Sequence, residues 1–176
     1  AKARERATEV ASLHGNGVEK RGKEMVYNDV LEAIGHTPMI RLNRMNKPGN
    51  AQVLVKFEGM NVGGSIKTRT AYNMIADAEK RGIIDKDTII VEPTSGNQGI
   101  GLALIGAVKG YKTIIIMPDS VSEERRKLVR HYGAEVILIH DAGNIGECIE
   151  ECLQTALRMK AENPKVFVPQ QFENPA

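Results

Sequence analysis

The second half of the chain alternates short apolar runs with longer amphipathic stretches. The apolar runs span residues 88–91, 113–117, 135–139 and 166–168, and the amphipathic stretches span 98–109, 122–132 and 144–161. Alternation of strand and helix patterns indicates βαβ units. The runs are continuously apolar, which is typical of parallel strands that are covered on both faces. The sequence therefore predicts an α/β fold built on a parallel sheet.

The first half contains shorter elements of mixed kind. Apolar residues at helical spacing over 30–34 predict a short helix that ends at Gly35. Short strands are expected over 39–42 and 53–57, because both are apolar runs separated by turn residues. Apolar residues at helical spacing over 71–78 predict a longer amphipathic helix, with basic residues and Gly82 at its C-terminus.

Composition limits the classes of partner. The chain has 176 residues, enough for about one domain, and a net charge of +2 with both signs spread along it. That charge pattern favours neither nucleic acid nor an anionic membrane surface as a partner. No apolar run approaches the ~20 residues that span a bilayer. Residues 1–25 are polar and charged, and we expect them to form an arm before a domain that covers 26–176.

The two cysteines are interpreted as packing residues. Cys148 and Cys152 lie four residues apart in a predicted helix and therefore share one face. A metal site would need a third and a fourth ligand, which the sequence does not place beside them, so no metal is expected. Low cysteine content fits a reducing compartment, and we expect a cytoplasmic location.

A glycine-rich turn leads into the longer amphipathic helix. Gly63 and Gly64 allow a tight turn and a close approach of the backbone to a ligand. Ser65 is a typical N-cap residue, which places Lys67 in the first helical turn. The positive end of a helix dipole disfavours an ammonium group there, and a neutral amine is what bonding to a carbonyl carbon requires. Most lysines are solvated surface residues, so the local pattern alone leaves both interpretations open.

A second polar turn follows the apolar run at 88–91. Pro93 is expected to end strand pairing, and the Thr-Ser-Gly-Asn segment at 94–97 opens the next helix. Ligands of open α/β sheets lie beyond the carboxyl ends of the strands. Hydroxyl, amide and helix N–H groups at that place can bind a carboxylate. A phosphate group, or a plain helix cap, fits the same loop. Gln171, after the last apolar run, would add another amide to this cleft.

Nucleotide-binding patterns match less well. The lysine turn lacks the residue order and spacing of a Walker A loop, and no G-x-G-x-x-G segment follows a predicted strand. A nucleotide-binding α/β domain is therefore an alternative that explains the glycines poorly.

A wider pattern runs through the chain in six segments. They are 34–38 (Ile-Gly-His-Thr-Pro), 63–67 (Gly-Gly-Ser-Ile-Lys), 92–97 (Glu-Pro-Thr-Ser-Gly-Asn), 122–126 (Ser-Glu-Glu-Arg-Arg), 133–135 (Gly-Ala-Glu) and 170–176 (Gln-Gln-Phe-Glu-Asn-Pro-Ala). In this order and spacing the chain resembles the fold-type II pyridoxal-phosphate enzymes, in particular cysteine synthase and the catalytic core of cystathionine β-synthase. The resemblance implies the three-layer αβα parallel-sheet fold of tryptophan-synthase-β-like enzymes. Residues 26–176 would be the N-terminal half of the catalytic domain.

The resemblance also implies roles for individual residues. Lys67 would bond covalently to the aldehyde of pyridoxal 5'-phosphate and later, as a free amine, take the α-proton of the substrate. Asn97 would hydrogen-bond the ring hydroxyl oxygen of the cofactor. The loop that would hold the amino-acid carboxylate consists of Thr94, Ser95, Gly96, Asn97 and Gln98, with Gln171 on its far side. The implied reaction is β-replacement on an activated serine, in which O-acetylserine and sulfide give cysteine.

Two residues depart from the family pattern. Thr68 stands where most relatives have aspartate, and Gln98 stands where they usually have threonine. The substrate therefore stays open, with threonine synthase, cystathionine β-synthase and the β-subunit of 2-amino-4-oxopentanoate thiolase as alternatives within the fold type.

The family's glycine-rich phosphate loop is not recognised in the sequence. We therefore expect activity to require a missing C-terminal half or a second chain, and we expect a homodimer when the enzyme is complete. A non-catalytic folding or partner-binding fragment is the alternative outside the enzyme class.

Overall fold

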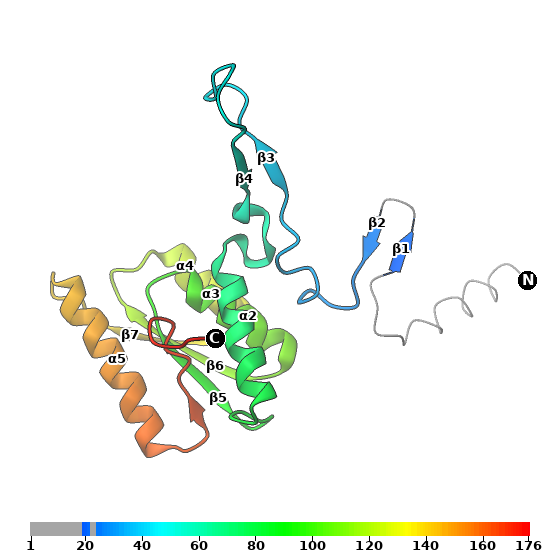
Figure 1. Ribbon diagram of the computed structural model, residues 1–176. Helices are drawn as coiled ribbons and strands as arrows, with labels where there is room; N and C mark the ends of the chain where they lie inside the picture. Colours follow the sequence, from blue (N-terminus) through cyan, green and yellow to red (C-terminus); the bar gives the residue numbers. More distant parts are fainter. Residues whose placement is uncertain (1–18, 22–23) are drawn as a thin grey trace, which may run out of the picture.

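The computed structural model of the chain describes residues 19–21 and 24–176 (Figure 1). The strands are β1 (Glu19–Arg21), β2 (Glu24–Val26), β3 (Met39–Arg41), β4 (Leu54–Lys56), β5 (Ile89–Pro93), β6 (Lys112–Pro118), β7 (Glu135–Ile139) and β8 (Val166–Phe167). The helices are α2 (Lys67–Lys80), α3 (Asn97–Lys109), α4 (Glu123–His131) and α5 (Ile145–Glu162), with two 3-10 turns, η1 (Glu58–Met60) and η2 (Val62–Gly64). Most of the expected arm lies outside the described residues.

A four-stranded parallel sheet forms the centre of the molecule. Its strand order is β7-β6-β5-β8, and every neighbouring pair is parallel. The continuous apolar runs of the sequence supply these strands, and the side chains of the two central strands, β5 and β6, are mostly buried on both faces. The predicted α/β fold with a parallel sheet is confirmed.

Helices cover both faces of this sheet, so the body has three layers. Side chains of α2, α3 and α4 form one core with alternate strand residues such as Ile115 and Met117. The intervening strand residues, Ile114 and Ile116, belong to a second core with α5. This division follows from the period-2 alternation of side chains along a strand. It accounts for the apolar character of every position in the middle of β6.

A glycine brings α2 and α3 into close contact. A Cβ atom at Gly101 of α3 would lie 3.2 Å from the carbonyl oxygen of Lys67 and 3.1 Å from the Cβ atom of Ala71. Only a residue without a side chain leaves the two helices at this separation. The start of α2 is thereby fixed against the first turns of α3.

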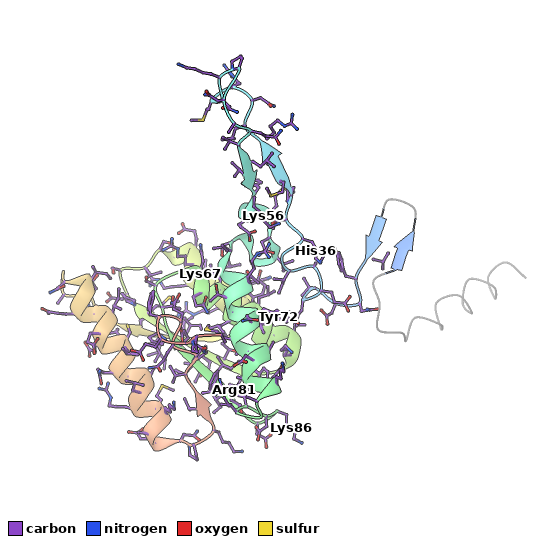
Figure 2. All side chains as sticks on the ribbon, viewed as in Figure 1. His36, Lys56, Lys67, Tyr72, Arg81 and Lys86 are labelled. Carbon is purple, nitrogen blue, oxygen red and sulfur yellow. The ribbon has the colours of Figure 1, made fainter. Side chains whose placement is uncertain are left out.

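Strands β3 and β4 pair antiparallel and project from the body (Figure 1). Their apolar side chains are exposed, including Ile40, Leu54 and Val55. Lys56 lies at the end of this hairpin that is nearer the body, and its Nζ donates to the carbonyl of Thr37 at 2.9 Å (Figure 2). This bond joins the two sides of the hairpin at its base.

The helix expected over 30–34 is instead an irregular turn. The backbone N–H of Ala33 donates to the carbonyl of Val30 at 3.2 Å, which is a three-residue spacing, and Gly35 reverses the chain with a φ of 88°. Five residues are too few to offset the cost of helix nucleation when no apolar face extends them.

Pro93 does not end strand pairing, contrary to expectation. It is the last residue of β5 and pairs with Ile116, and the N–H of Thr94 donates to the Ile116 carbonyl at 2.9 Å. On the other side, β8 pairs with β5 only as far as Ile90. The missing N–H of the proline is tolerated because, in the part of the chain that the structure describes, no strand pairs with Pro93 on that side.

Candidate active site

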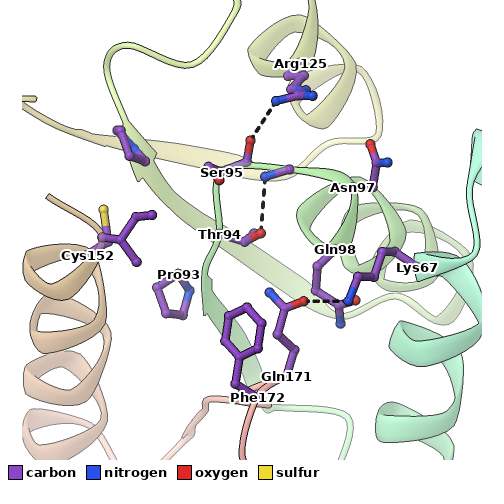
Figure 3. Close-up of a pocket in the computed structure, with 13 residues that line it drawn as sticks. Lys67, Pro93, Thr94, Ser95, Asn97, Gln98, Arg125, Cys152, Gln171 and Phe172 are labelled. Atoms are coloured by element: carbon purple, nitrogen blue, oxygen red, sulfur yellow. Dashed lines mark hydrogen bonds between the residues drawn. The ribbon is translucent and has the colours of Figure 1, made fainter. Parts of the chain in front are cut away.

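A cleft of about 460 Å³ opens at the carboxyl ends of β5 and β6. All seven residues that the sequence singled out line it: Lys67, Thr94, Ser95, Gly96, Asn97, Gln98 and Gln171. They come from three segments that are far apart in sequence and that surround one space (Figure 3). The position agrees with the rule that ligands of parallel α/β sheets bind beyond the carboxyl ends of the strands.

The lysine turn, residues 61–67, places one amine in this cleft. Gly63 and Gly64 both adopt positive φ angles, of 78° and 77°. Ser65 Oγ accepts the N–H of Lys67 at 3.2 Å, so this hydroxyl supports the start of α2 as expected. The half-buried Lys67 side chain donates from Nζ to Oε1 of Gln171 at 3.1 Å (Figure 3).

A buried asparagine supports the same turn. Asn61 Oδ1 accepts the backbone N–H groups of Gly35 at 2.9 Å and Val62 at 3.1 Å, and Asn61 Nδ2 donates to the carbonyl of Ser65 at 3.1 Å. A single side chain therefore links two loops and both ends of the turn.

Arg69 and Glu58 form an ion pair behind the turn. Arg69 donates to both carboxylate oxygens, at 3.0 and 2.9 Å, and also to the carbonyl of Gly35 at 2.7 Å. Thr37 adds a hydroxyl donor to Glu58 at 2.8 Å. The bond from Arg69 is the main cause that holds the pKa of Glu58 below its usual value.

Sequence reasoning missed this group of supporting residues. The sequence did contain one indication of this group, because Gly35 and Thr37 belong to the segment at 34–38. That segment was part of the wider pattern, but no role was assigned to it.

The asparagine loop, residues 94–98, has fewer internal contacts. The N–H of Gly96 donates to Thr94 Oγ1, and Arg125 donates to the carbonyl of Ser95, both at 3.3 Å (Figure 3). No cap side chain accepts a hydrogen bond at the start of α3, and Asn97 is exposed. Because the first N–H groups of a helix have no partners within the helix, the loop offers donors to an anion in the cleft.

Two buried polar side chains have no protein partner. Gln98 is 1% exposed, and neither its Oε1 nor its Nε2 makes a hydrogen bond. The hydroxyl of Thr68 is likewise buried and unpaired. Both are the positions at which the sequence departs from the pattern of the family it resembles. An unpaired buried polar group costs about 1–3 kcal/mol, so an amide at a cleft wall indicates a ligand or solvent partner.

The glutamine turn, residues 169–173, closes the opposite side of the cleft. Its backbone is held by Glu92, which accepts the N–H of Gln170 at 2.9 Å and that of Gln171 at 3.2 Å. Burial raises the pKa of Glu92 to about 7, although the two N–H donors act in the opposite direction. In the sequence, Glu92 opens the segment at 92–97, in which the resemblance implied roles only from Thr94 onward.

The cysteines lie in the second core. Both are buried on α5, and burial raises the pKa of the Cys152 thiol to about 12. Among the described residues, no group of three or more His, Cys, Asp or Glu side chains is placed to hold a metal ion. Within the same ranges, no helix is both long and apolar enough to cross a bilayer.

Comparison with known proteins gives consistent matches. Residues 30–176 match the sequence model of a family described as pyridoxal-phosphate dependent enzyme. A cysteine synthase from Flavobacterium sp. is 46% identical over 152 residues, which is 86% of this chain and 48% of the relative. A probable cysteine synthase from Bacillus subtilis is 43% identical over 145 residues, or 82% of this chain and 45% of the relative.

Solved structures agree with these sequence matches. A hydrogen sulfide-producing enzyme from Fusobacterium nucleatum superposes with a TM-score of 0.77 at 49% identity, covering 86% of this chain and 48% of that one. An O-ureido-L-serine synthase gives a TM-score of 0.70 at 39% identity, covering 85% and 46%. The chain spans about half the length of the relatives it matches.

Proposed function

The chain belongs to the family of pyridoxal-phosphate dependent enzymes, and from that premise we propose that the complete protein catalyses β-replacement on an activated serine. The proposed substrates are O-acetylserine and sulfide, and the product is cysteine. The observation that carries the proposal is the Lys67 amine, which lies in a cleft with the asparagine loop and hydrogen-bonds to Gln171. The names of the cysteine synthase relatives support this choice of substrate.

The residues present fit the cofactor. Lys67 is half-buried and lines a cleft of about 460 Å³, which is within the range of small-molecule sites. Lys67 would hold pyridoxal 5'-phosphate by its aldehyde, and the exposed amide of Asn97 would hydrogen-bond the ring hydroxyl oxygen. The bound cofactor supplies an electron sink for negative charge at the substrate Cα.

The protein groups would orient the amino acid and move its proton. Thr94, Ser95 and the N–H groups at the start of α3 would bind the substrate carboxylate, because helix N-termini attract anions. Gln171 would contact the same carboxylate from the opposite wall. The Lys67 amine, once free, would accept the proton from Cα, a role in which its position beside the carboxylate site matters more than its charge. Gln98 would supply an amide to the substrate or to a water molecule at the cleft wall.

The wider setting of the enzyme is part of the proposal. We propose a small amino-acid substrate, a cytoplasmic location and a homodimer for the complete protein. The named relatives are enzymes of amino-acid chemistry, which supports the substrate class.

Visible absorbance of the complete polypeptide that carries these residues tests the proposal. The purified protein with pyridoxal 5'-phosphate is expected to absorb visible light and to form cysteine from O-acetylserine and sulfide. Lys67→Ala is expected to lose both the visible band and turnover. Lys86→Ala changes an exposed lysine far from the cleft and is expected to keep both (Figure 2). Colour and turnover that survive in Lys67→Ala would reject the assigned role of the lysine. A coloured wild-type protein that forms no cysteine would reject the proposed substrates.

A further inference from the structure

Glu92 is a buried acid that the proposed mechanism does not use. It is 1% exposed and lies at the end of β5, immediately before the residues that lead into the asparagine loop. Its two carboxyl oxygens accept hydrogen bonds from two consecutive backbone N–H groups, those of Gln170 and Gln171. These contacts join residues that are 78 and 79 positions apart in sequence.

The turn that Glu92 holds has a conformation that needs support. Gln170 has a φ of 54°, and it is the non-glycine residue with positive φ in the described part of the chain. A non-glycine side chain in this left-handed region persists when surrounding contacts fix it. The two bonds to Glu92 are such contacts, and they act on the residues on both sides of the peptide bond between Gln170 and Gln171.

The side chain of Gln171 then reaches the amine of Lys67, at 3.1 Å (Figure 3). A continuous set of hydrogen bonds therefore runs from Glu92 through the Gln171 backbone and side chain to Lys67. We propose that Glu92 is a positioning residue, which fixes the glutamine turn so that the Gln171 amide faces the amino-acid carboxylate site. The inference rests on the proposed function, because it assumes that Gln171 contacts the substrate.

An acid is the residue type that this geometry requires. An apolar side chain of similar size would leave two buried N–H groups without acceptors. Glutamine offers one acceptor oxygen and turns an N–H₂ group toward the second donor, so it can satisfy only one of the two N–H groups. Aspartate keeps both acceptor oxygens but is shorter by one methylene.

A double-mutant cycle on the complete holoenzyme tests the inference. The variants are Glu92→Gln, Gln171→Ala and the combination of both, and the readouts are KM for O-acetylserine, kcat and the dissociation constant of pyridoxal 5'-phosphate. Glu92→Gln is expected to raise KM about tenfold, because one of the two hydrogen bonds that hold the glutamine turn is lost. In the Gln171→Ala background, the same change is expected to add about twofold or less, because the group it positions is already absent. The cofactor dissociation constant is expected to change less than KM in all variants, because the bond from Lys67 to the cofactor aldehyde would form without the Gln171 amide.

Hydrogen exchange supplies a readout that is independent of turnover. The backbone amides of Gln170 and Gln171 are expected to exchange faster in Glu92→Gln than in the wild type, and faster than the amides of β6 in the same variant. Glu92→Asp is expected to recover part of the KM and of the protection, and it replaces Glu92→Gln in the cycle if that variant does not fold. Glu173→Gln changes an exposed acid in the same turn and is expected to match the wild type.

Equal effects of Glu92→Gln in both backgrounds would overturn the inference, and so would an unchanged KM in Glu92→Gln. Either result would leave the proposed function intact, provided that the wild-type protein is coloured and active. Loss of the proposed function would show instead in the Lys67→Ala comparison, which does not involve Glu92.

Discussion

The lysine turn and the asparagine loop each lie immediately before a helix that lines the cleft, but they are held very differently. The lysine turn is linked to its surroundings through Asn61, through Ser65 and through the ion pair of Arg69 with Glu58. The asparagine loop makes two side-chain hydrogen bonds, both at 3.3 Å. Glycines and hydroxyls occur in both segments, so composition does not explain the contrast. The segments differ in whether their polar groups bond to other protein groups or face the cleft.

This difference separates two tasks of one site. The polar side chains of Asn61 and Ser65 are held by protein contacts within the lysine turn, which leaves a single amine for the cleft and fits a group that must be placed accurately. The asparagine loop leaves the Ser95 hydroxyl, the amides of Asn97 and Gln98 and helix N–H groups without protein partners, which fits a surface completed by a ligand. Substitutions in the lysine turn should therefore lower the free energy of unfolding even without ligand. Substitutions in the asparagine loop should mainly weaken the binding of substrate or cofactor.

Matched glycine substitutions give the largest expected difference. Gly63 has a φ of 78°, and a Cβ atom there would lie 2.6 Å from Thr68 Oγ1, whereas Gly96 has a φ of −146° and no atom within 4 Å of its Cβ position. Gly63→Ala is expected to lower the free energy of unfolding by about 3 kcal/mol, from backbone strain and crowding together. Gly96→Ala is expected to change it by less than about 0.5 kcal/mol and to raise KM for the amino acid. Denaturant unfolding of the complete polypeptide measures both; equal destabilisation would remove the distinction between the two segments.

Matched asparagine substitutions come next. Asn61 is 6% exposed and accepts two backbone N–H groups, whereas Asn97 is exposed in the cleft. Asn61→Ala is expected to destabilise the protein by about 2–3 kcal/mol, because two part-buried donors lose their acceptor. Asn97→Ala is expected to preserve stability within about 0.5 kcal/mol and to weaken cofactor binding. Thermal unfolding without cofactor, together with a cofactor titration, separates the two outcomes. A destabilised Asn97→Ala protein with normal cofactor affinity would contradict the comparison.

The two carboxyl groups beside the site should respond to pH in opposite directions. The pKa of Glu92 is raised to about 7, so the native state holds its proton more tightly than the unfolded chain. Its contribution to stability is therefore greatest at low pH and decreases as pH rises between the unfolded and folded pKa values. The pKa of Glu58 is lowered, so its contribution is present above its unfolded pKa and is lost only as pH falls below it.

Between about pH 5 and pH 7 the Glu92 contribution should fall by roughly 2 kcal/mol. The measurement is the free energy of unfolding of the wild type minus that of Glu92→Gln across this range. The subtraction cancels the pH-dependent contributions of the other titrating groups, which include His140 with its raised pKa. A difference that does not change with pH would show that the native state does not retain the Glu92 proton.

The sequence was sufficient to predict the body and the members of the cleft. The parallel strands and their covering helices can be predicted from local periodicity. When both faces of a strand are covered, successive residues point to opposite faces and all of them are apolar. Lys67, the asparagine loop and Gln171 were assigned together through the family resemblance, and the structure places them around one space. Their chemical roles stay predictions, because position alone does not establish which group each one binds.

The supporting residues could not be found by the same reasoning. Arg69 reaches Gly35 across 34 positions, and Glu92 reaches Gln170 across 78, so no local pattern joins them. Pairs at such separations become contacts only after the chain has folded around the sheet. The helix predicted over 30–34 was wrong for a related reason. Apolar residues over five positions can show helical spacing, but so short a segment does not offset the cost of helix nucleation.

The smallest expected effect concerns the unpaired hydroxyl of Thr68. This group lies in the protein interior next to Gly63, and it has no hydrogen-bond partner. Thr68→Val replaces the hydroxyl with a methyl group of similar shape, so the loss of a buried unpaired polar group should offset slight crowding, and unfolding free energy should change by less than about 1 kcal/mol. Catalytic constants should remain at wild-type values, because Thr68 does not line the cleft. A strongly destabilised Thr68→Val protein would mean that the hydroxyl has a partner such as an internal water molecule. The lysine turn would then depend on solvent in the way that we attribute only to the asparagine loop.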